Sequence, residues 1–305
     1  MTRYILRRAG QSLLVLLAVS LIVFLILHAS GDPIQILMPA EATQEQVEKM
    51  RSTLGLDRPL WVQYGRFLWN AAQGDLGISF RHGQPAARLV LERLPASAQL
   101  VVVAFTLSFL ISIPLGVLAA AHRGSLFERV TLVGSLVGIS APHFWVGIIL
   151  ILVFCVELQW LPSSGRGTWA HLVLPAGSLA FYRLALFIRL LRAGMLDVLT
   201  QDYIRTARAK GLAESRVIYL HALRNTLIPF VTVAGLQMGA VLAGAIVTEH
   251  IFAWPGMGRL FLEAIGHMDF PVIIAWALIT STIFLVVNFL VDMVYVFLDP
   301  RIRHD

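Results

Sequence analysis

Six long apolar stretches dominate the sequence. A helix needs about 20 mainly apolar residues to cross about 30 Å of hydrocarbon, because each residue rises about 1.5 Å. Six segments reach this length: Ala9–Leu27, Leu100–Ala121, Val130–Phe154, Leu172–Leu191, Leu227–Ile251 and Val272–Phe297. Backbone polar groups in lipid must be paired within the segment, which favours helices. With 57% hydrophobic and only 14% charged residues, the sequence predicts an all-α membrane protein with six transmembrane helices.

Basic residues are distributed unevenly between the two sides that these spans define. With a cytoplasmic N-terminus, one side receives positions 3, 7, 8, 123, 129, 301 and 303 and a cluster within 189–224. The short loops on the other side contain only Arg166 and Arg259. Because basic loops stay in the cytoplasm, we expect both termini there. The net charge of +6 then reflects topology, and nucleic-acid binding is not expected.

The segment 31–97 is too long for a structureless connection between the first two spans. Thr43–Gln46 has the pattern of a capping box, and the helix that it opens is expected to reach Leu54 before Gly55. Pro59 is expected to open a second helix that ends near Gly74, and a third is expected at Pro85–Leu94. The sequence therefore predicts a small helical periplasmic insertion, either a lid that packs on the spans or a docking surface.

The loop between the fourth and fifth spans has two helical halves. Met195–Ala209 has helical spacing, Gly211 interrupts it, and Leu212–Leu223 resumes it. Apolar and basic residues of the first half lie on different stripes, so each face can meet a different neighbour. By these features alone, the loop is either an elbow gripped by another protein or an amphipathic segment lying on anionic lipid.

Several motifs in order along the chain resemble one family. DYIRTARAKGL at 202–212, followed by HALRN at 221–225, resembles the EAA-type loop of ABC-importer permeases, and most closely that of the dipeptide/oligopeptide/nickel branch. The likeness extends over nearly the whole chain. It includes GLDRPL at 55–60, QY at 63–64, GDLGISF at 74–80, EHIFAWPG at 249–256, Asp292, and DPRIR at 299–303.

The resemblance implies an organisation for the chain. Residues 1–30 would contain the cytoplasmic N-terminus and first span, and 31–97 the periplasmic helical segment. Residues 98–298 would form a type I ABC permease core with five spans, and 299–305 a cytoplasmic tail. The loop 193–225 would couple to an ATPase. Its candidate contact residues are Asp202, Tyr203, Arg205, Thr206, Ala207, Arg208, Ala209, Lys210, Gly211 and Leu212.

The resemblance also implies a function and partners. The chain would be a permease subunit in a bacterial inner membrane, importing dipeptides, oligopeptides or glutathione-like peptides, with nickel as the alternative solute. Its partners would be a second homologous permease, two cytoplasmic ATPases and a periplasmic solute-binding protein. A passive channel is an alternative from another class, but it leaves the Gly211 elbow without a purpose.

The sequence motifs predict that this chain is not itself an enzyme. A P-loop needs a glycine before its lysine, and neither Lys49 nor Lys210 follows one. ATP and Mg are therefore expected in the partner ATPases, with no cofactor bound by this chain. Neither H-E-x-x-H nor G-x-S-x-G occurs in the sequence, so no catalytic residue is predicted. The histidines are too widely spaced in sequence to suggest a local metal site.

Three polar residues in the spans are candidates for the translocation pathway: Arg183, Gln237 and Glu249. Arg183 lies roughly 12 residues into its span, near mid-bilayer, where a charge costs at least about 2.5–3.5 kcal/mol and needs a partner or a wet cavity. It either meets an anionic group on the solute or pairs with the second permease.

Other span residues are expected to have structural or gating roles. Asn288 and Asp292 are four apart and share a helix face, and Pro142 and Pro114 are candidate bend points. Gly134 with Gly138, and Gly235 with Gly239, have the small-residue spacing that allows close helix packing in lipid.

Overall fold

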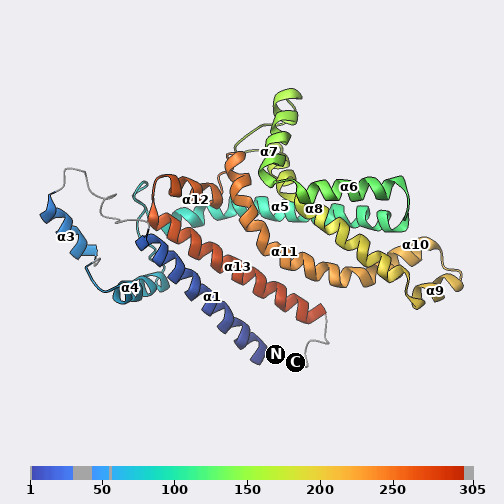
Figure 1. The fold of residues 1–305 in the computed structure, drawn as a ribbon, viewed down its shortest axis with the longest axis horizontal. Coiled ribbons are helices and arrows are strands. Elements are labelled where there is room, and N and C mark those ends of the chain that lie inside the picture. The colour runs from blue at the N-terminus through green and yellow to red at the C-terminus, as the bar shows by residue number, and fades with distance from the viewer. Residues whose placement is uncertain (1, 30–42, 55–56, 299–305) are drawn as a thin grey trace. The chain divides into compact units, whose positions relative to one another are not determined.

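The computed structural model describes residues 2–29, 43–54 and 57–298 and is helical throughout, with no strand in those ranges (Figure 1). In chain order the α-helices are α1 (Thr2–Ala29), α3 (Gln44–Leu54), α4 (Leu60–Ala72), α5 (Ala86–Ala121), α6 (Leu126–Ser140), α7 (His143–Ile151), α8 (Trp169–Leu199), α9 (Asp202–Ala209), α10 (Glu214–Arg216), α11 (Leu223–Ile251), α12 (Met257–Gly266) and α13 (Phe270–Leu298). Two π-helical turns, η1 (Leu152–Glu157) and η2 (Val217–Ala222), follow α7 and precede α11.

Five predicted spans each lie within one continuous helix: α1, α5, α8, α11 and α13. In the described residues, five helices are long and apolar enough to cross a membrane. The number rises to six if the bent pair formed by α6 and α7 with η1 counts as one span. The predicted all-α membrane fold is confirmed.

The third predicted span, Val130–Phe154, is not one continuous helix but breaks between α6 and α7 at Pro142, which the sequence named as a candidate bend point. The chain bends there by 110° between α6 and the helix that follows. Ala141 is extended (φ −75°, ψ 127°) because the ring of Pro142 disfavours helical backbone in the residue before it. Pro142 then forms the N-cap of α7. Pro114, in contrast, lies inside α5 and does not end that helix.

The insertion after α1 also differs in part from the prediction. α3 begins after Thr43, whose hydroxyl accepts from the Gln46 amide (3.4 Å) while the Gln46 side chain accepts from the Thr43 amide (3.0 Å). Pro59 precedes α4 as expected. The third helix is not separate, because its residues form the start of the 36-residue α5, which continues through Pro95. Gly55 and most of the segment before α3 lie outside the described residues.

The chain divides into two compact units. The first comprises Met1–Pro95 with Arg259–Val286. In it α4 packs on α1, with the ring of Phe24 lying 5.3 Å from that of Tyr64 and 5.9 Å from that of Phe67. The Ser79 hydroxyl donates to the buried Asp269 carboxylate (2.5 Å), which ties the loop before α5 to the start of α13.

The second unit comprises Ala96–Gly258 with Val287–Asp305. Here α8 packs against α6, α7 and α11. The close approach of neighbouring helices depends on two of the glycines that the sequence predicted to serve packing. A Cβ at Gly138 would lie 2.6 Å from that of Ala185 on α8, and one at Gly235 would lie 2.7 Å from Val291 on α13. A Cβ at Gly134 would meet nothing within 4 Å, so only Gly138 of that motif serves packing.

Candidate functional site

The segment between α8 and α11 forms a helical elbow. α8 ends at Leu199 and α9 begins at Asp202, so the predicted continuous helix Met195–Ala209 is wrong. The Thr200 hydroxyl donates to a carbonyl of the preceding turn (2.7 Å), a local bond that competes with helix continuation. The predicted interruption at Gly211 is confirmed, because its φ of +75° lies in the left-handed region that favours glycine.

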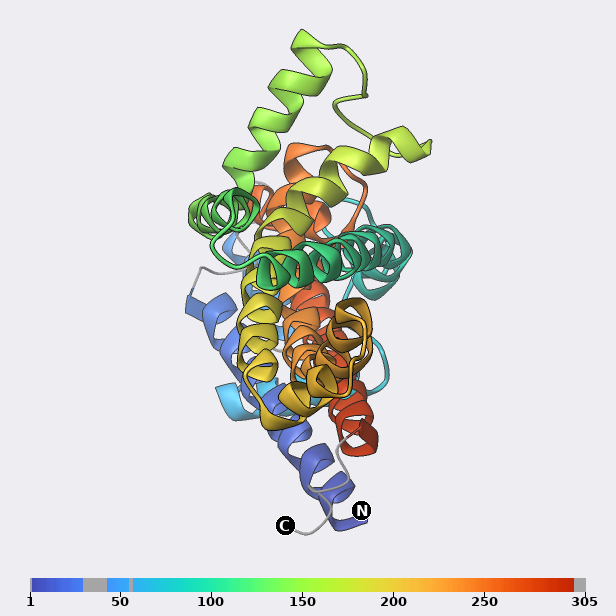
Figure 2. The same ribbon diagram turned by 90° about the vertical axis from the view of Figure 1, so that its right-hand side faces the viewer.

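Two buried residues anchor α9 to the spans. Ile204 is fully buried and Ala207 is buried one turn later. Both belong to a core cluster that includes Val117 of α5, Leu191 of α8 and Phe230 of α11. Ile204 was missed in the sequence analysis, although its three-residue spacing from Ala207 could have identified it. Figures 1 and 2 show the elbow next to the ends of α8 and α11.

The other face of the elbow points outward. Ala207 faces the spans and Leu212 is half-buried. The remaining predicted contact residues are exposed: Asp202, Tyr203, Arg205, Thr206, Arg208, Ala209, Lys210 and Gly211. The elbow thus combines a buried apolar attachment with an exposed polar surface that contains four charged side chains.

Polar contacts brace the bend. The Arg208 guanidinium pairs with the Glu214 carboxylate at 2.7 Å, across Gly211. This hydrogen bond raises the pKa of Arg208 above its usual range. The Asn225 amide donates to the Tyr203 hydroxyl (3.0 Å), joining α9 to the first turn of α11. Both contacts are exposed, so each contributes at most about 1 kcal/mol, and the buried residues dominate the attachment.

A second polar link was missed in the sequence analysis. The buried Glu128 carboxylate near the start of α6 accepts from Arg192 on α8. The Gly124 amide also donates to Glu128 (2.5 Å), and Ser125 caps α6. The two residues are 64 positions apart, so only the tertiary fold brings this acid and base together.

Arg183 is buried without a counter-ion in the described part of the chain. Its side chain lies in the middle of α8, and the residue is only 4% exposed. Nη1 donates a long hydrogen bond (3.3 Å) to the Leu179 carbonyl, whereas Nε has no partner. The guanidinium lies beside Gly244 of α11, where a Cβ would be 3.8 Å from Nη2. A cation in this position needs either a partner from outside the described chain or a wet cavity.

Glu249 is buried at the end of α11 and already has donors. Ser97 donates to its carboxylate at 2.5 Å, and the Gly258 amide donates at 2.7 Å. The Trp254 indole N–H donates to the Ala96 carbonyl (2.9 Å) in the same region. These contacts favour a structural role, in which Glu249 fastens the turn after α11 to α5.

The remaining candidates are not brought together with these groups by any described contact. Gln237 and Asn288 are half-buried, on α11 and α13 respectively. The side chain of Asp292 lies outside the described part of α13. Their predicted roles remain predictions.

Two family models together cover almost the entire chain. The model of the binding-protein-dependent transport system inner membrane component matches residues 112–304. The model of the N-terminal part of such membrane components matches residues 1–103. The chain belongs to this family.

Curated permeases of the family match along their full lengths. The chain is 40% identical over 316 residues to the oligopeptide transport system permease protein AppB of Bacillus subtilis, covering 100% of both chains. It is also 40% identical over 337 residues to the dipeptide transport system permease protein DppB of Escherichia coli K12, covering 100% of this permease and 99% of that one.

Solved ABC transporters share the fold of the permease. The MetNI methionine ABC transporter, in inward-facing conformations, matches with a TM-score of 0.55 and 16% identity, over 69% of this chain and 96% of that one. An amino acid ABC transporter matches with a TM-score of 0.53 and 15% identity, over 70% and 94%. The predicted resemblance and the ABC importer permease fold are confirmed, and the chain is a transport component of the inner membrane.

Proposed function

We propose that this permease forms half of the translocation pathway of an ATP-driven importer of dipeptides and oligopeptides. The observation that carries the proposal is the full-length identity of 40% to both a dipeptide and an oligopeptide permease. The relatives' names favour peptides over the nickel alternative. A second permease would form the other half of the pathway, and a periplasmic binding protein would deliver the peptide.

The elbow supports a coupling role in this importer. Two ATPase subunits would bind ATP and Mg, and one would grip the exposed surface formed by Asp202, Tyr203, Arg205, Thr206 and Arg208–Gly211, together with the half-buried Leu212. Because Ile204 and Ala207 bury α9 against three spans, a displacement of the gripped surface is transmitted to those spans. Both termini and the elbow would then be cytoplasmic, as the distribution of basic residues predicts.

A cysteine crosslinking experiment tests this coupling. The native Cys155 is first replaced by serine, since no other cysteine occurs in the sequence. Arg205→Cys in the assembled transporter is expected to crosslink to the ATPase, and Arg129→Cys at the start of α6 is a matched exposed arginine outside the elbow. An intact complex without an ATPase adduct at position 205 would refute the coupling proposal.

Peptide uptake tests the solute class independently. Proteoliposomes containing the full complex and its binding protein are expected to accumulate a labelled dipeptide or pentapeptide only with internal ATP. Accumulation of nickel without peptide uptake would favour the alternative, and uptake without ATP would indicate a passive channel.

We also propose that Arg183 meets the peptide carboxylate during transport. Its single long hydrogen bond and its unpartnered Nε leave it available to an anion. Arg183→Gln is expected to reduce uptake of a peptide with a free C-terminal carboxylate more than uptake of the amidated peptide. Loss of the second permease from the purified variant would instead indicate pairing between subunits. Normal uptake with normal assembly would exclude the pathway role. Gln237 remains a predicted pathway residue, whereas the contacts of Glu249 favour a structural role over the predicted pathway role.

A further inference from the structure

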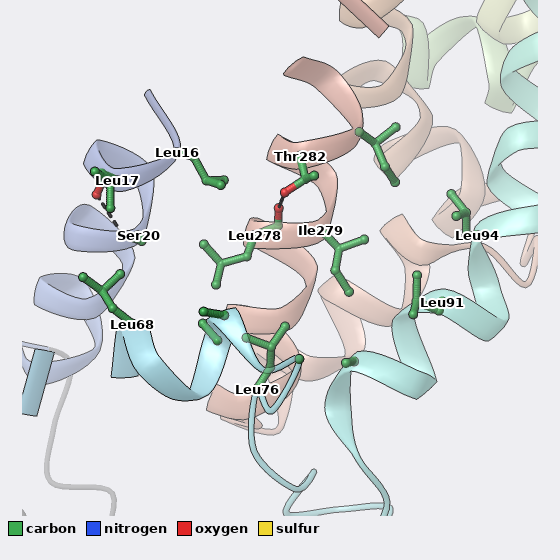
Figure 3. Close-up of a pocket in the computed structure, with 15 residues that line it drawn as sticks. Leu16, Leu17, Ser20, Leu68, Leu76, Leu91, Leu94, Leu278, Ile279 and Thr282 are labelled. Carbon is green, nitrogen blue, oxygen red and sulfur yellow. Dashed lines mark hydrogen bonds between the residues drawn. The ribbon is translucent and has the colours of Figure 1, made fainter. Parts of the chain in front are cut away.

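A cavity of about 630 Å³ lies within the first unit of the permease. Its walls come from α1, α4, the loop after α4, the first turns of α5, and α13. Figure 3 shows leucines and isoleucines of these elements directed toward a common space, among them Leu17, Leu68, Leu91, Leu94, Leu278 and Ile279.

The described lining is aliphatic and offers no free polar side chain. Among the described residues of the lining, only Ser20 and Thr282 bring side-chain hydroxyls to the cavity. The Ser20 hydroxyl is 2.8 Å from the Leu17 carbonyl and 2.9 Å from the Tyr64 hydroxyl, and the Thr282 hydroxyl donates to the Leu278 carbonyl at 2.8 Å. A polar ligand, including a peptide, would be desolvated here without compensating hydrogen bonds, and water would also lack partners. An apolar occupant is therefore required.

The cavity lies at hydrocarbon depth. Leu16, Leu17 and Ser20 lie near the centre of the apolar segment Arg8–Ile26 in α1. Leu278 to Ile283 are central in the corresponding segment Phe270–Val291 of α13. α1 is also well exposed outside the cavity, where Leu14 is 68% and Ile22 is 55% exposed. The wall of the cavity is thus continuous with a surface suited to lipid chains.

α4 places one end of the cavity near the membrane interface. Tyr64 and Phe67 of this helix pack on Phe24 of α1. Trp61 and Trp69, eight residues apart, are 76% and 68% exposed on α4. Exposed tryptophans are typical of the headgroup level of a membrane, because one part of the indole ring can contact hydrocarbon while the other contacts water. A lipid whose acyl chain entered the cavity beneath α4 would therefore have its headgroup near these tryptophan rings.

We propose that the cavity binds one acyl chain of a bilayer phospholipid, held between α1, α4, α13 and the first turns of α5. Lipid is a better occupant than water because the lining offers water no hydrogen-bond partner, whereas an acyl chain passes from the bilayer into the cavity without desolvating a polar group. The proposal concerns the membrane rather than the transported solute, so it does not depend on the peptide specificity.

The test uses the assembled transporter in liposomes that contain a phosphatidylcholine with a diazirine on one acyl chain. After irradiation, peptide mapping is expected to find adducts at residues 16–20 and 278–283 in excess over those at Leu14, which is exposed outside the cavity. Ala87→Phe, which fills the cavity from α5, is expected to lower these cavity adducts roughly tenfold. That change equals about 1.4 kcal/mol. Leu14→Phe is the matched control and should leave them unchanged.

A second, smaller substitution shows whether a decrease in labelling comes from filling the cavity or from misfolding of the first variant. Ala71→Leu adds a smaller side chain from α4 and is expected to give a smaller decrease in the same adducts, with unchanged assembly on size exclusion. Equal labelling of cavity residues and Leu14, or labelling unaffected by Ala87→Phe in an assembled complex, would overturn the proposal. Lipid adducts that are absent from these residues in the assembled transporter, because the second permease covers the cavity, would also overturn it.

Discussion

Truncation of Ile204 separates the anchoring of α9 from its exposed contact surface. Ile204→Ala removes a fully buried side chain from the cluster that joins α9 to α5, α8 and α11. Such truncations cost about 2–5 kcal/mol when the site relaxes only partly. The polar contacts of α9 are weaker, because the Arg208–Glu214 pair and the Tyr203–Asn225 hydrogen bond are exposed.

The size of this loss in free energy determines how far α9 should detach and what should be observed. A loss of about 3 kcal/mol raises the population of detached α9 by roughly two orders of magnitude, since about 1.4 kcal/mol corresponds to a factor of ten. Hydrogen exchange at residues 202–210 should therefore accelerate. In the reconstituted importer, the loaded binding protein should no longer stimulate ATP hydrolysis, because the ATPase would grip a helix that no longer moves the spans.

Ile188→Ala provides the matched control. Ile188 is 5% exposed in the middle of α8, so the same truncation lowers stability without touching α9. It is expected to preserve receptor-stimulated ATP hydrolysis and the slow exchange of α9. Wild-type stimulation in an assembled Ile204→Ala complex, or equal loss in both variants, would refute the reasoning.

Three further predictions concern packing, a buried carboxylate and the elbow. Gly138→Ala should destabilise the purified permease by about 1–3 kcal/mol in thermal unfolding, because its Cβ would collide with α8, whereas Gly134→Ala should be nearly neutral. Ser97→Ala should lower the unfolding temperature, since the buried Glu249 carboxylate loses a donor worth about 1–3 kcal/mol; an unchanged temperature would contradict this. Gly211→Val should weaken ATPase co-purification through backbone strain of about 1–3 kcal/mol, and Gly211→Asn should retain the ATPase.

The long spans could be predicted from the sequence because lipid imposes one strong requirement. A run of apolar residues that must pair its own backbone groups becomes a helix, and α1, α5, α8, α11 and α13 follow this rule. The capping box at Thr43 and the break at Gly211 were also predictable, since each depends on local backbone chemistry.

The predictions from the sequence failed where local signals for and against a helix competed, or where tertiary contacts determine the structure. Pro142 and Pro114 have the same ring, yet only Pro142 lies at a break between helices. Thr200 ends α8 through one local hydrogen bond inside an otherwise helical pattern. The pair Glu128–Arg192 and the anchor Ser97–Glu249 join residues 64 and 152 positions apart, so sequence spacing contains no trace of either.

The continuity of α11 has a geometric consequence. This 29-residue helix begins beside the elbow and ends near the Glu249 carboxylate, which fastens the turn after α11 to α5. At about 1.5 Å per residue it is about 44 Å long, so a tilt of about 10° about its midpoint moves each end by about 4 Å in opposite directions. A rigid helix that tilts about its midpoint therefore moves one end inward as the other end moves outward.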